Sequence, residues 1–169
     1  MAFKGVMANF VMGADGSTSH SGNSAALSSV ADRARFHEIR SHASAILIGG
    51  NTARNEPYAS TPVPLIVITS TKELPQSISS NPLAHIWDLD PVAAIAKAKV
   101  EFGENILVEG GINLLKELLL ANLIDILFLT ISGKTGGENV YDLSALTRDF
   151  TVESSEKIDG ETFLKLVKN

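Results

Sequence analysis

Two glycine pairs, each directly after a short apolar run, have residue types that suit contact with a phosphorylated ligand. Gly49-Gly50 follows Ala45 to Ile48, and Gly110-Gly111 follows Ile106 to Val108 and the charged Glu109. Glycines between a strand and a helix let a ligand approach the backbone, and the free N–H groups of the first helical turn favour an anion. The pairs predict phosphate contacts, with a simple tight turn as the alternative explanation.

A third segment with suitable chemistry, Thr69-Ser70-Thr71-Lys72, follows the apolar run Leu65 to Ile68. Its hydroxyls and lysine suit a phosphate monoester, while a capped turn with a solvated lysine is the alternative. Together the three segments could hold a long phosphorylated molecule such as a dinucleotide. Neither G-x-x-x-x-G-K-[ST] nor a G-x-G-x-x-G after the first strand is present, so a dinucleotide would bind outside these standard fingerprints.

Carboxylates beside glycine or proline turns are the candidates for contact with a polar ring or a ribose. They are Asp15, Glu56 and Glu109, although such carboxylates also commonly cap a turn. The histidines have no metal spacing, and G-x-S-x-G and H-E-x-x-H are absent, so we expect neither a metal site nor a hydrolase triad. Four further side chains have two explanations each: Arg40 and Arg54 could bind phosphate or lie in solvent, and Tyr58 and Trp87 could stack on a flat ring or fill the core.

The composition is that of an ordinary globular protein, and we expect one domain over residues 1–169. The net charge of −5 argues against a general binder of nucleic acid or acidic membranes. Cysteine is absent, which excludes disulfides and thiolate chemistry and favours a cytoplasmic location. The N-terminal residues resemble neither a secretory signal nor a membrane span.

Short apolar runs alternate with helical patterns, and these elements must position the candidate residues. One helix is predicted to begin at Ser28 or Ser29 and to extend to Ala43, a second covers Pro91 to Phe102, and a third includes Leu114 to Leu119. Asn51 to Pro57 is expected to be a turn or a brief helix. The strands are predicted at Phe3 to Met12, Ala45 to Ile48, Leu65 to Ile68, Ile86 to Leu89, Ile106 to Val108, Ile124 to Ile131, Phe150 to Glu156 and Thr162 to Val167.

This order of elements predicts an α/β fold with a mostly parallel central sheet and an antiparallel C-terminal edge hairpin. Ligands of such sheets bind at the carboxyl ends of the strands, where both glycine pairs and the Ser70 segment fall. Two polar segments are expected to be a surface loop, Ser17 to Asn23, and a mobile glycine-rich loop, Lys134 to Asn139.

Several stretches, in this order and at this spacing, resemble the reductase domain of riboflavin biosynthesis. This domain is the C-terminal half of bifunctional deaminase-reductases and is similar to dihydrofolate reductase. The resemblance covers most of residues 6–137. The matching stretches are Met12 to Gly16, Ser21 to Ser24, Ser28 to Arg40, Ala45 to Thr52, Ile106 to Gly111 and Leu118 to Asp125.

The resemblance implies a three-layer dihydrofolate-reductase-like fold and a homodimer that transfers hydride from NADPH to an opened ribosylamino-pyrimidine. The expected substrate is 5-amino-6-(5-phosphoribosylamino)uracil or a related pyrimidine. It implies catalytic roles for Asp15, near the meeting point of nicotinamide and substrate, and for Glu109. The implied cofactor contacts are Gly49, Thr52, Ser70, Lys72, Gly110, Gly111 and Asn113, and the implied substrate contacts are Ser24, Ser28, Arg40 and Glu56.

The sequence departs from the family pattern at three places. Ser17 stands where the family usually has a lysine, and Tyr58 to Thr61 lack an arginine that usually helps to hold the substrate's phosphate. There is no P-C-x-x-C zinc site of a deaminase, so we expect a stand-alone reductase. The alternatives are a dihydrofolate or pteridine reductase and a non-catalytic nucleotide-binding protein of the same fold.

Overall fold

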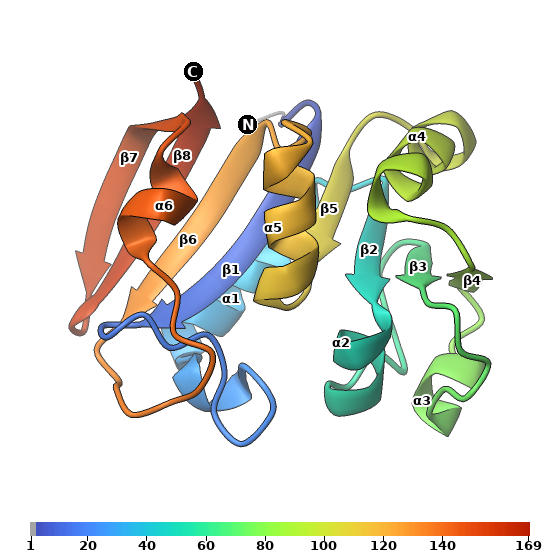
Figure 1. Ribbon diagram of the computed structural model, residues 1–169, viewed down its shortest axis with the longest axis horizontal. Coiled ribbons are helices and arrows are strands. Elements are labelled where there is room, and N and C mark those ends of the chain that lie inside the picture. Colours follow the sequence, from blue (N-terminus) through green and yellow to red (C-terminus); the bar gives the residue numbers. More distant parts are fainter. Residues whose placement is uncertain (1–2) are drawn as a thin grey trace.

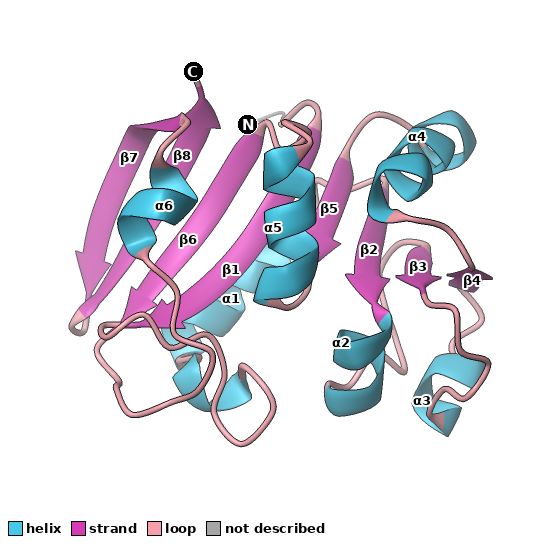
Figure 2. Ribbon diagram, in the orientation of Figure 1, coloured by secondary structure: helices cyan, strands magenta, loops and turns pink. Residues whose placement is uncertain are grey.

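The computed structural model describes residues 3–169 and consists of one eight-stranded sheet with helices on both faces (Figures 1 and 2). The strands are β1 Val6–Gly13, β2 Ala45–Gly49, β3 Leu65–Ile68, β4 Ala84–Trp87, β5 Ile106–Glu109, β6 Ile126–Ser132, β7 Phe150–Ile158 and β8 Glu161–Lys168. The helices are the 3-10 turn η1 Ala25–Leu27 and α1 Val30–Arg40, α2 Gly50–Asn55, α3 Gln76–Ser79, α4 Pro91–Phe102, α5 Ile112–Leu120 and α6 Leu143–Thr147.

The strand order is β4-β3-β2-β5-β1-β6-β8-β7. Strands β1 to β6 are parallel, whereas β8 is antiparallel to β6 and β7 is antiparallel to β8, which confirms the predicted sheet and edge hairpin. The hairpin turns at Asp159 and Gly160, which both have positive φ angles. Because the parallel strands share one direction, the residues that follow them meet at one edge of the sheet.

The sheet separates two apolar layers, which accounts for the continuous apolar runs of its central strands. In β5, Ile106 and Val108 belong to one layer and Leu107 to the other, and all three are buried. The first layer includes residues of α4, α5 and α6, and the second includes residues of α1, α2 and α3. Figure 1 shows α5 in front of the sheet and α1 behind it, so the fold has three layers.

Two strand boundaries differ from the sequence prediction because side-chain hydrogen bonds set them. The strand expected from Phe3 begins at Val6, since Gly5 has a φ of 110° and donates its N–H to Asn105 Oδ1. The strand expected from Ile124 begins at Ile126, since Asp125 donates its backbone N–H to the Val6 carbonyl and accepts from Val6 N through Oδ2. The terminal residues of an apolar run can therefore pack outside the strand.

The strand expected at Ile86 to Leu89 lies two residues earlier, at β4. It must pair with the four residues of β3, and Asp90 already caps α4 through Ala93 N. Ser29 rather than Ser28 is the N-cap of α1, which ends at Arg40, before the predicted Ala43. The short elements η1, α3 and α6 were not predicted, because a single turn is too short to show helical periodicity.

The two segments expected to be a surface loop and a mobile loop are paired with each other. Thr18 N donates to the Glu138 carbonyl over 3.0 Å, and Glu138 N donates to the Ser19 carbonyl over 2.7 Å. Ser17 is fully buried. A side chain at Gly137 would collide with the Ser19 carbonyl, so glycine allows this close approach. The loop at Lys134 to Asn139 is therefore hydrogen-bonded to the first loop, and its mobility stays a prediction.

Candidate active site

The two glycine pairs lie beside each other at the carboxyl edge of the sheet. Strand β2 leads into α2 through Gly49 and Gly50, and the neighbouring β5 leads into α5 through Gly110 and Gly111. A Cβ on Gly110 would lie 3.6 Å from Oγ1 of Thr52, so the second turn packs closely against α2. The predicted cofactor residues of these turns therefore form one continuous surface.

The N-terminus of α5 is open to a ligand. Its N-cap, Gly111, offers no side chain, and the first helical hydrogen bond joins Leu115 N to the Gly111 carbonyl. No side-chain cap is therefore present for the N–H groups of Ile112, Asn113 and Leu114. Apart from Gly111 itself and its two chain neighbours, no described residue has an atom within 4 Å of an ideal Cβ at Gly111. The backbone donors and the positive end of the helix dipole suit one group of a pyrophosphate.

A guanidinium and several hydroxyls gather at the end of β3. Arg54 Nη2 donates to Asn51 Oδ1 over 2.7 Å, and Nη1 donates to Thr71 Oγ1 over 3.3 Å. Thr69 Oγ1 accepts from Thr71 N, and Ser70 lies between these threonines. The sequence left two explanations for Arg54, and both stay open, because its side chain is exposed to solvent and also lies beside these hydroxyl groups. This cluster suits a phosphate monoester.

Lys72 extends from the same segment toward a separate hollow. That hollow has a volume of about 390 Å³ and lies at β4 and α3, where Leu74, Ile78 and Ile86 line it together with Lys72. Lys72 is exposed. Lys72 therefore follows the Thr69 to Thr71 segment directly in the chain, but its side chain lines an apolar hollow at the edge strand β4.

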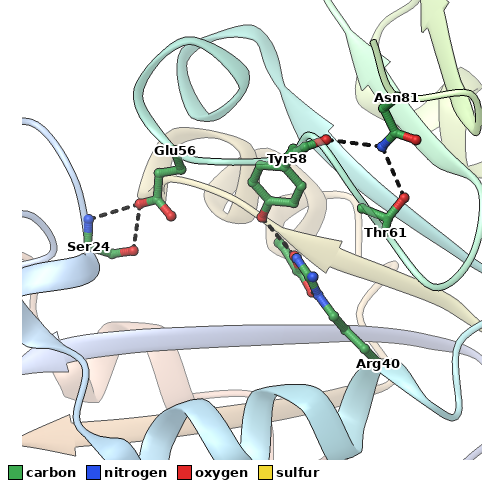
Figure 3. A network of polar contacts seen from close by, with 7 residues as sticks. Ser24, Arg40, Glu56, Tyr58, Thr61 and Asn81 are labelled. Carbon is green, nitrogen blue, oxygen red and sulfur yellow. Dashed lines mark hydrogen bonds and ion pairs between the residues drawn. The ribbon is translucent and has the colours of Figure 1, made fainter. Parts of the chain in front are cut away.

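Arg40, Glu109 and Tyr58 form a buried polar network, of which Figure 3 labels Arg40 and Tyr58. Arg40 donates to both carboxylate oxygens of Glu109, over 2.8 Å from Nε and 2.7 Å from Nη2, and Tyr58 Oη donates to Glu109 Oε2 over 2.7 Å. The three residues are at most 8% exposed. The guanidinium also lies over the Phe36 ring, 4.1 Å from its centroid. Both carboxylate oxygens of Glu109 already accept hydrogen bonds from Arg40 or Tyr58. The expected contact of Glu109 with a substrate stays a prediction.

The ionisation of this network follows from its burial and its charges. Burial raises the pKa of Tyr58 well above its ordinary value, and the Glu109 carboxylate raises it further. Burial alone would lower the pKa of Arg40, but the hydrogen bonds and charge of Glu109 raise it overall. The network therefore contains a neutral phenol and a charged guanidinium, which are poor proton donors at neutral pH.

The two serines predicted to face the substrate each donate to a carboxylate. Ser24 donates to Glu56 Oε1 from its backbone N over 2.9 Å and from Oγ over 2.6 Å, which joins the start of η1 to the end of α2 (Figure 3). Ser28 Oγ donates to Asp32 Oδ2 over 2.6 Å. Ser24 and Glu56 are thus brought together, whereas Ser28 is bound within its own segment.

Asp15 holds two loops in place. Its carboxylate accepts from Ser17 Oγ and from the backbone N–H groups of Ser17 and Gly136. The side-chain hydrogen bond from Ser17, followed by the Gly136 and Ser17 backbone bonds, lowers the pKa of Asp15 to about 2. Asp15 is therefore an anion at neutral pH and is not suited to donate a proton.

Sequence reasoning did not single out two residues that shape this region. Asn81, 4% exposed, donates from Nδ2 to the Tyr58 carbonyl and to Thr61 Oγ1, which fixes the segment after α2. Lys134 donates from Nζ to the Ala26 carbonyl, between the candidate serines. Neither residue has a local motif, because its partners lie far away in sequence. Within residues 3–169, no three histidine or carboxylate side chains could hold a metal ion, and no helix is long and apolar enough to cross a bilayer.

The three-layer α/β structure, with its mostly parallel sheet and antiparallel C-terminal strands, has a dihydrofolate-reductase-like fold. Residues 4–164 match the family described as RibD C-terminal domain. The chain belongs to this family of riboflavin-biosynthesis reductases. No curated protein matches it at the sequence level.

Three solved structures illustrate the likeness in fold. A pyrimidine reductase-like protein from Corynebacterium diphtheriae has 16% identity and a TM-score of 0.75, with 98% of this chain and 92% of that one covered. The riboflavin biosynthesis reductase of Saccharomyces cerevisiae has 16% identity, a TM-score of 0.73 and coverage of 98% and 90%. The diaminohydroxyphosphoribosylaminopyrimidine deaminase/5-amino-6-(5-phosphoribosylamino)uracil reductase of Thermotoga maritima has 21% identity, a TM-score of 0.70 and coverage of 98% and 57%.

Proposed function

We propose that this protein is an NADPH-dependent oxidoreductase that reduces a ribosylamino-pyrimidine of riboflavin biosynthesis. The proposed substrate is 5-amino-6-(5-phosphoribosylamino)uracil or a related pyrimidine. The name of the Thermotoga maritima protein specifies the first of these compounds. The observation that supports this proposal is the meeting of two glycine turns and an open helix N-terminus at the carboxyl edge of the sheet.

The cofactor residues divide into two groups. Gly49, Thr52, Gly110, Gly111 and Asn113 would line the pyrophosphate and the adjoining ribose. Arg54, with the hydroxyls of Thr71 and Ser70, would hold the adenosine 2′-phosphate, since its guanidinium is already oriented by Asn51 and Thr71. This second group is what would separate NADPH from NADH, and the predicted cofactor contact of Lys72 stays a prediction, because Lys72 lines the separate hollow at α3 and β4.

The substrate side consists of Ser24, Ser28, Arg40 and Glu56. NADPH, when bound, supplies the hydride, so the protein must orient two reactants and exclude water. We propose that the buried Glu109 positions the Gly110 turn through Arg40 and Tyr58. Asp15 would position the first loop beside the reactants through its bond to Gly136. Both residues would then act by orientation rather than by proton transfer.

The direct test is NADPH oxidation, followed by absorbance, with the ribosylamino-pyrimidine and separately with dihydrofolate. Reduction of the pyrimidine supports the proposal, and reduction of dihydrofolate alone would show a dihydrofolate reductase instead. Calorimetry with NADPH tests the remaining alternative, a nucleotide-binding protein of the same fold without catalytic activity. Tight binding without turnover of any pyrimidine or pteridine would identify a non-catalytic nucleotide-binding protein.

We also propose a homodimer that acts in the cytoplasm. β7 lies at one end of the sheet and pairs only with β8, and Val152 and Ile158 on it are 51% and 37% exposed. A long exposed edge strand favours pairing with a second chain. Sedimentation equilibrium should give twice the chain mass of 18.0 kDa, and a monomer at every concentration would contradict the dimer. The absence of cysteine supports the cytoplasm, which cell fractionation tests.

A further inference from the structure

The turn η1 lies between Ser24 and Ser28, the two serines that are proposed to contact the substrate. Two backbone bonds close the turn. Leu27 N donates to the Ser24 carbonyl over 3.0 Å, and Ser28 N donates to the Ala25 carbonyl over 3.2 Å. Three residues are too few to form a stable helix by themselves. The position of the two serines therefore depends on contacts that hold the turn from outside.

Three such contacts hold η1, each on a different side. Ser24 donates to Glu56 at the end of α2, and the side chain of Leu27 is buried, with 1% exposed. The third contact is made by the Ala26 carbonyl. The last carbonyls of a helical turn lack an intrahelical partner, and Lys134 Nζ donates to this one over 2.6 Å. Lys134 thus ties the middle of the segment to the loop that follows β6.

The backbone of Lys134 is itself fixed. Its carbonyl accepts from Ala14 N over 3.0 Å, and its N–H donates to Ser132 Oγ over 3.3 Å. Two residues later, Gly136 N donates to Asp15 Oδ2 over 2.7 Å, so the loops after β1 and β6 lie side by side (Figure 1). Because the backbone is already ordered, only the side chain of Lys134 loses freedom when it bonds to Ala26.

No carboxylate competes for the ammonium group of Lys134 within the described residues 3–169. The ion pairs of this part of the chain involve other lysines and Arg40. A hydrogen bond from a charged donor to a carbonyl is shorter and stronger than one between neutral groups. The ammonium group can therefore remain on the Ala26 carbonyl.

We propose that Lys134 is a positioning residue, which holds η1, and with it Ser24 and Ser28, where these serines contact the substrate. The proposal rests on the reductase function proposed above and adds a residue to its substrate side. Lys134 acts through Ala26. The proposed cofactor contacts lie on other elements, at α2, the end of β3 and the start of α5, so Lys134 should affect binding of the pyrimidine and not of NADPH.

The first test does not depend on turnover. Lys134→Met removes the ammonium group and keeps an unbranched side chain, whereas Lys134→Arg keeps a charged donor. Hydrogen exchange of the Leu27 and Ser28 amides, measured by NMR, should become about fivefold faster in Lys134→Met and stay close to the wild type in Lys134→Arg. Lys4→Met is the matched control, because Lys4 is exposed and precedes β1 at the opposite edge of the sheet.

Unchanged exchange of both amides in Lys134→Met overturns the proposal. An equal acceleration in Lys4→Met, or one that extends to the amides of the buried strand β5, also overturns it, because the effect would then be a general loss of stability.

The second test measures kinetics with 5-amino-6-(5-phosphoribosylamino)uracil. Lys134→Met should raise KM for the pyrimidine by about fivefold, with kcat and the affinity for NADPH within about twofold of the wild type. Lys134→Arg should restore KM. A fall in kcat at unchanged KM, or no difference between Lys134→Met and Lys4→Met, overturns the proposed role in substrate binding. If the wild type reduces no pyrimidine, the reductase function fails, while hydrogen exchange still decides whether Lys134 holds the turn.

Discussion

Replacing Glu109 by glutamine tests whether the buried network holds the candidate active site together. The variant keeps the size of the side chain but removes the negative charge that faces Arg40 and accepts from Tyr58. Glu109 is 3% exposed and Arg40 is 8% exposed, so water cannot easily replace the lost partner. Removal of one partner from a buried ion pair typically costs about 3–5 kcal/mol.

For a chain of 169 residues, this loss corresponds to a decrease of the unfolding midpoint by about 6–20 °C. Thermal and urea unfolding of the wild type and the variant measure it. Glu101→Gln is the matched control, because Glu101 forms a pair with Lys97 in which both side chains are more than 40% exposed. That control should change the free energy of unfolding by less than about 1 kcal/mol.

The variant also separates positioning from proton transfer. If Glu109 positions the Gly110 turn, which is proposed to line the pyrophosphate, Glu109→Gln should weaken NADPH binding as well as lower kcat, and the pH profile of kcat should keep its shape. A double-mutant cycle with Arg40→Met should show strong coupling. A destabilisation no larger than that of Glu101→Gln, together with no coupling, would refute the reasoning from burial.

Three further predictions concern single side chains. Arg54→Gln should raise KM for NADPH by about tenfold and leave KM for NADH unchanged, because the guanidinium beside Thr71 would no longer meet the 2′-phosphate; equal effects on both cofactors would argue against this role. Asp15 has its pKa lowered from 3.8 to about 2, so its contribution to stability is present above pH 3.8 and is lost as the pH falls through about 2. In urea unfolding at several pH values, Asp15→Asn should lose less stability at acid pH than the wild type. The same pH dependence in both proteins would contradict this role of Asp15. Tyr58 has a raised pKa, so its contribution is present below pH 10.0 and is lost as the pH rises further; Tyr58→Phe should flatten the alkaline loss of stability, and an unchanged alkaline slope would count against the buried phenol.

Much of the sheet could be predicted from local sequence because its central strands are buried on both faces. Such strands appear as short apolar runs, and Ile106 to Val108 is an example. The helix α4 was predicted with its correct bounds, since Pro91 at its first position follows the capping Asp90. The predicted starts of β1 and β6 were wrong, because hydrogen bonds to residues distant in sequence determine them at Gly5 and Asp125.

The same division applies to the candidate site. Gly110-Gly111 stands at a strand-to-helix junction, and this local signal is sufficient to place the pair at the carboxyl edge. Arg40 shows no such signal, because a charged residue near the end of an amphipathic helix has the same local pattern in solvent and in a buried pair. Its partner Glu109 is 69 residues away, and the fold alone brings the two together. Tyr58 is similar, since its apolar ring predicts burial but not the acceptor of its hydroxyl.

The bond from Gly136 N to Asp15 joins positions that are 121 residues apart. During synthesis the first loop therefore leaves the ribosome long before its partner segment, and it must wait for most of the chain before it can take its final shape. Contacts of such long sequence separation form late, because the intervening chain loses its freedom before they give any stabilisation. The region where nicotinamide and substrate are proposed to meet is thus completed only after β6 has joined the sheet, so a nascent chain that ends before residue 134 lacks the partner of its first loop.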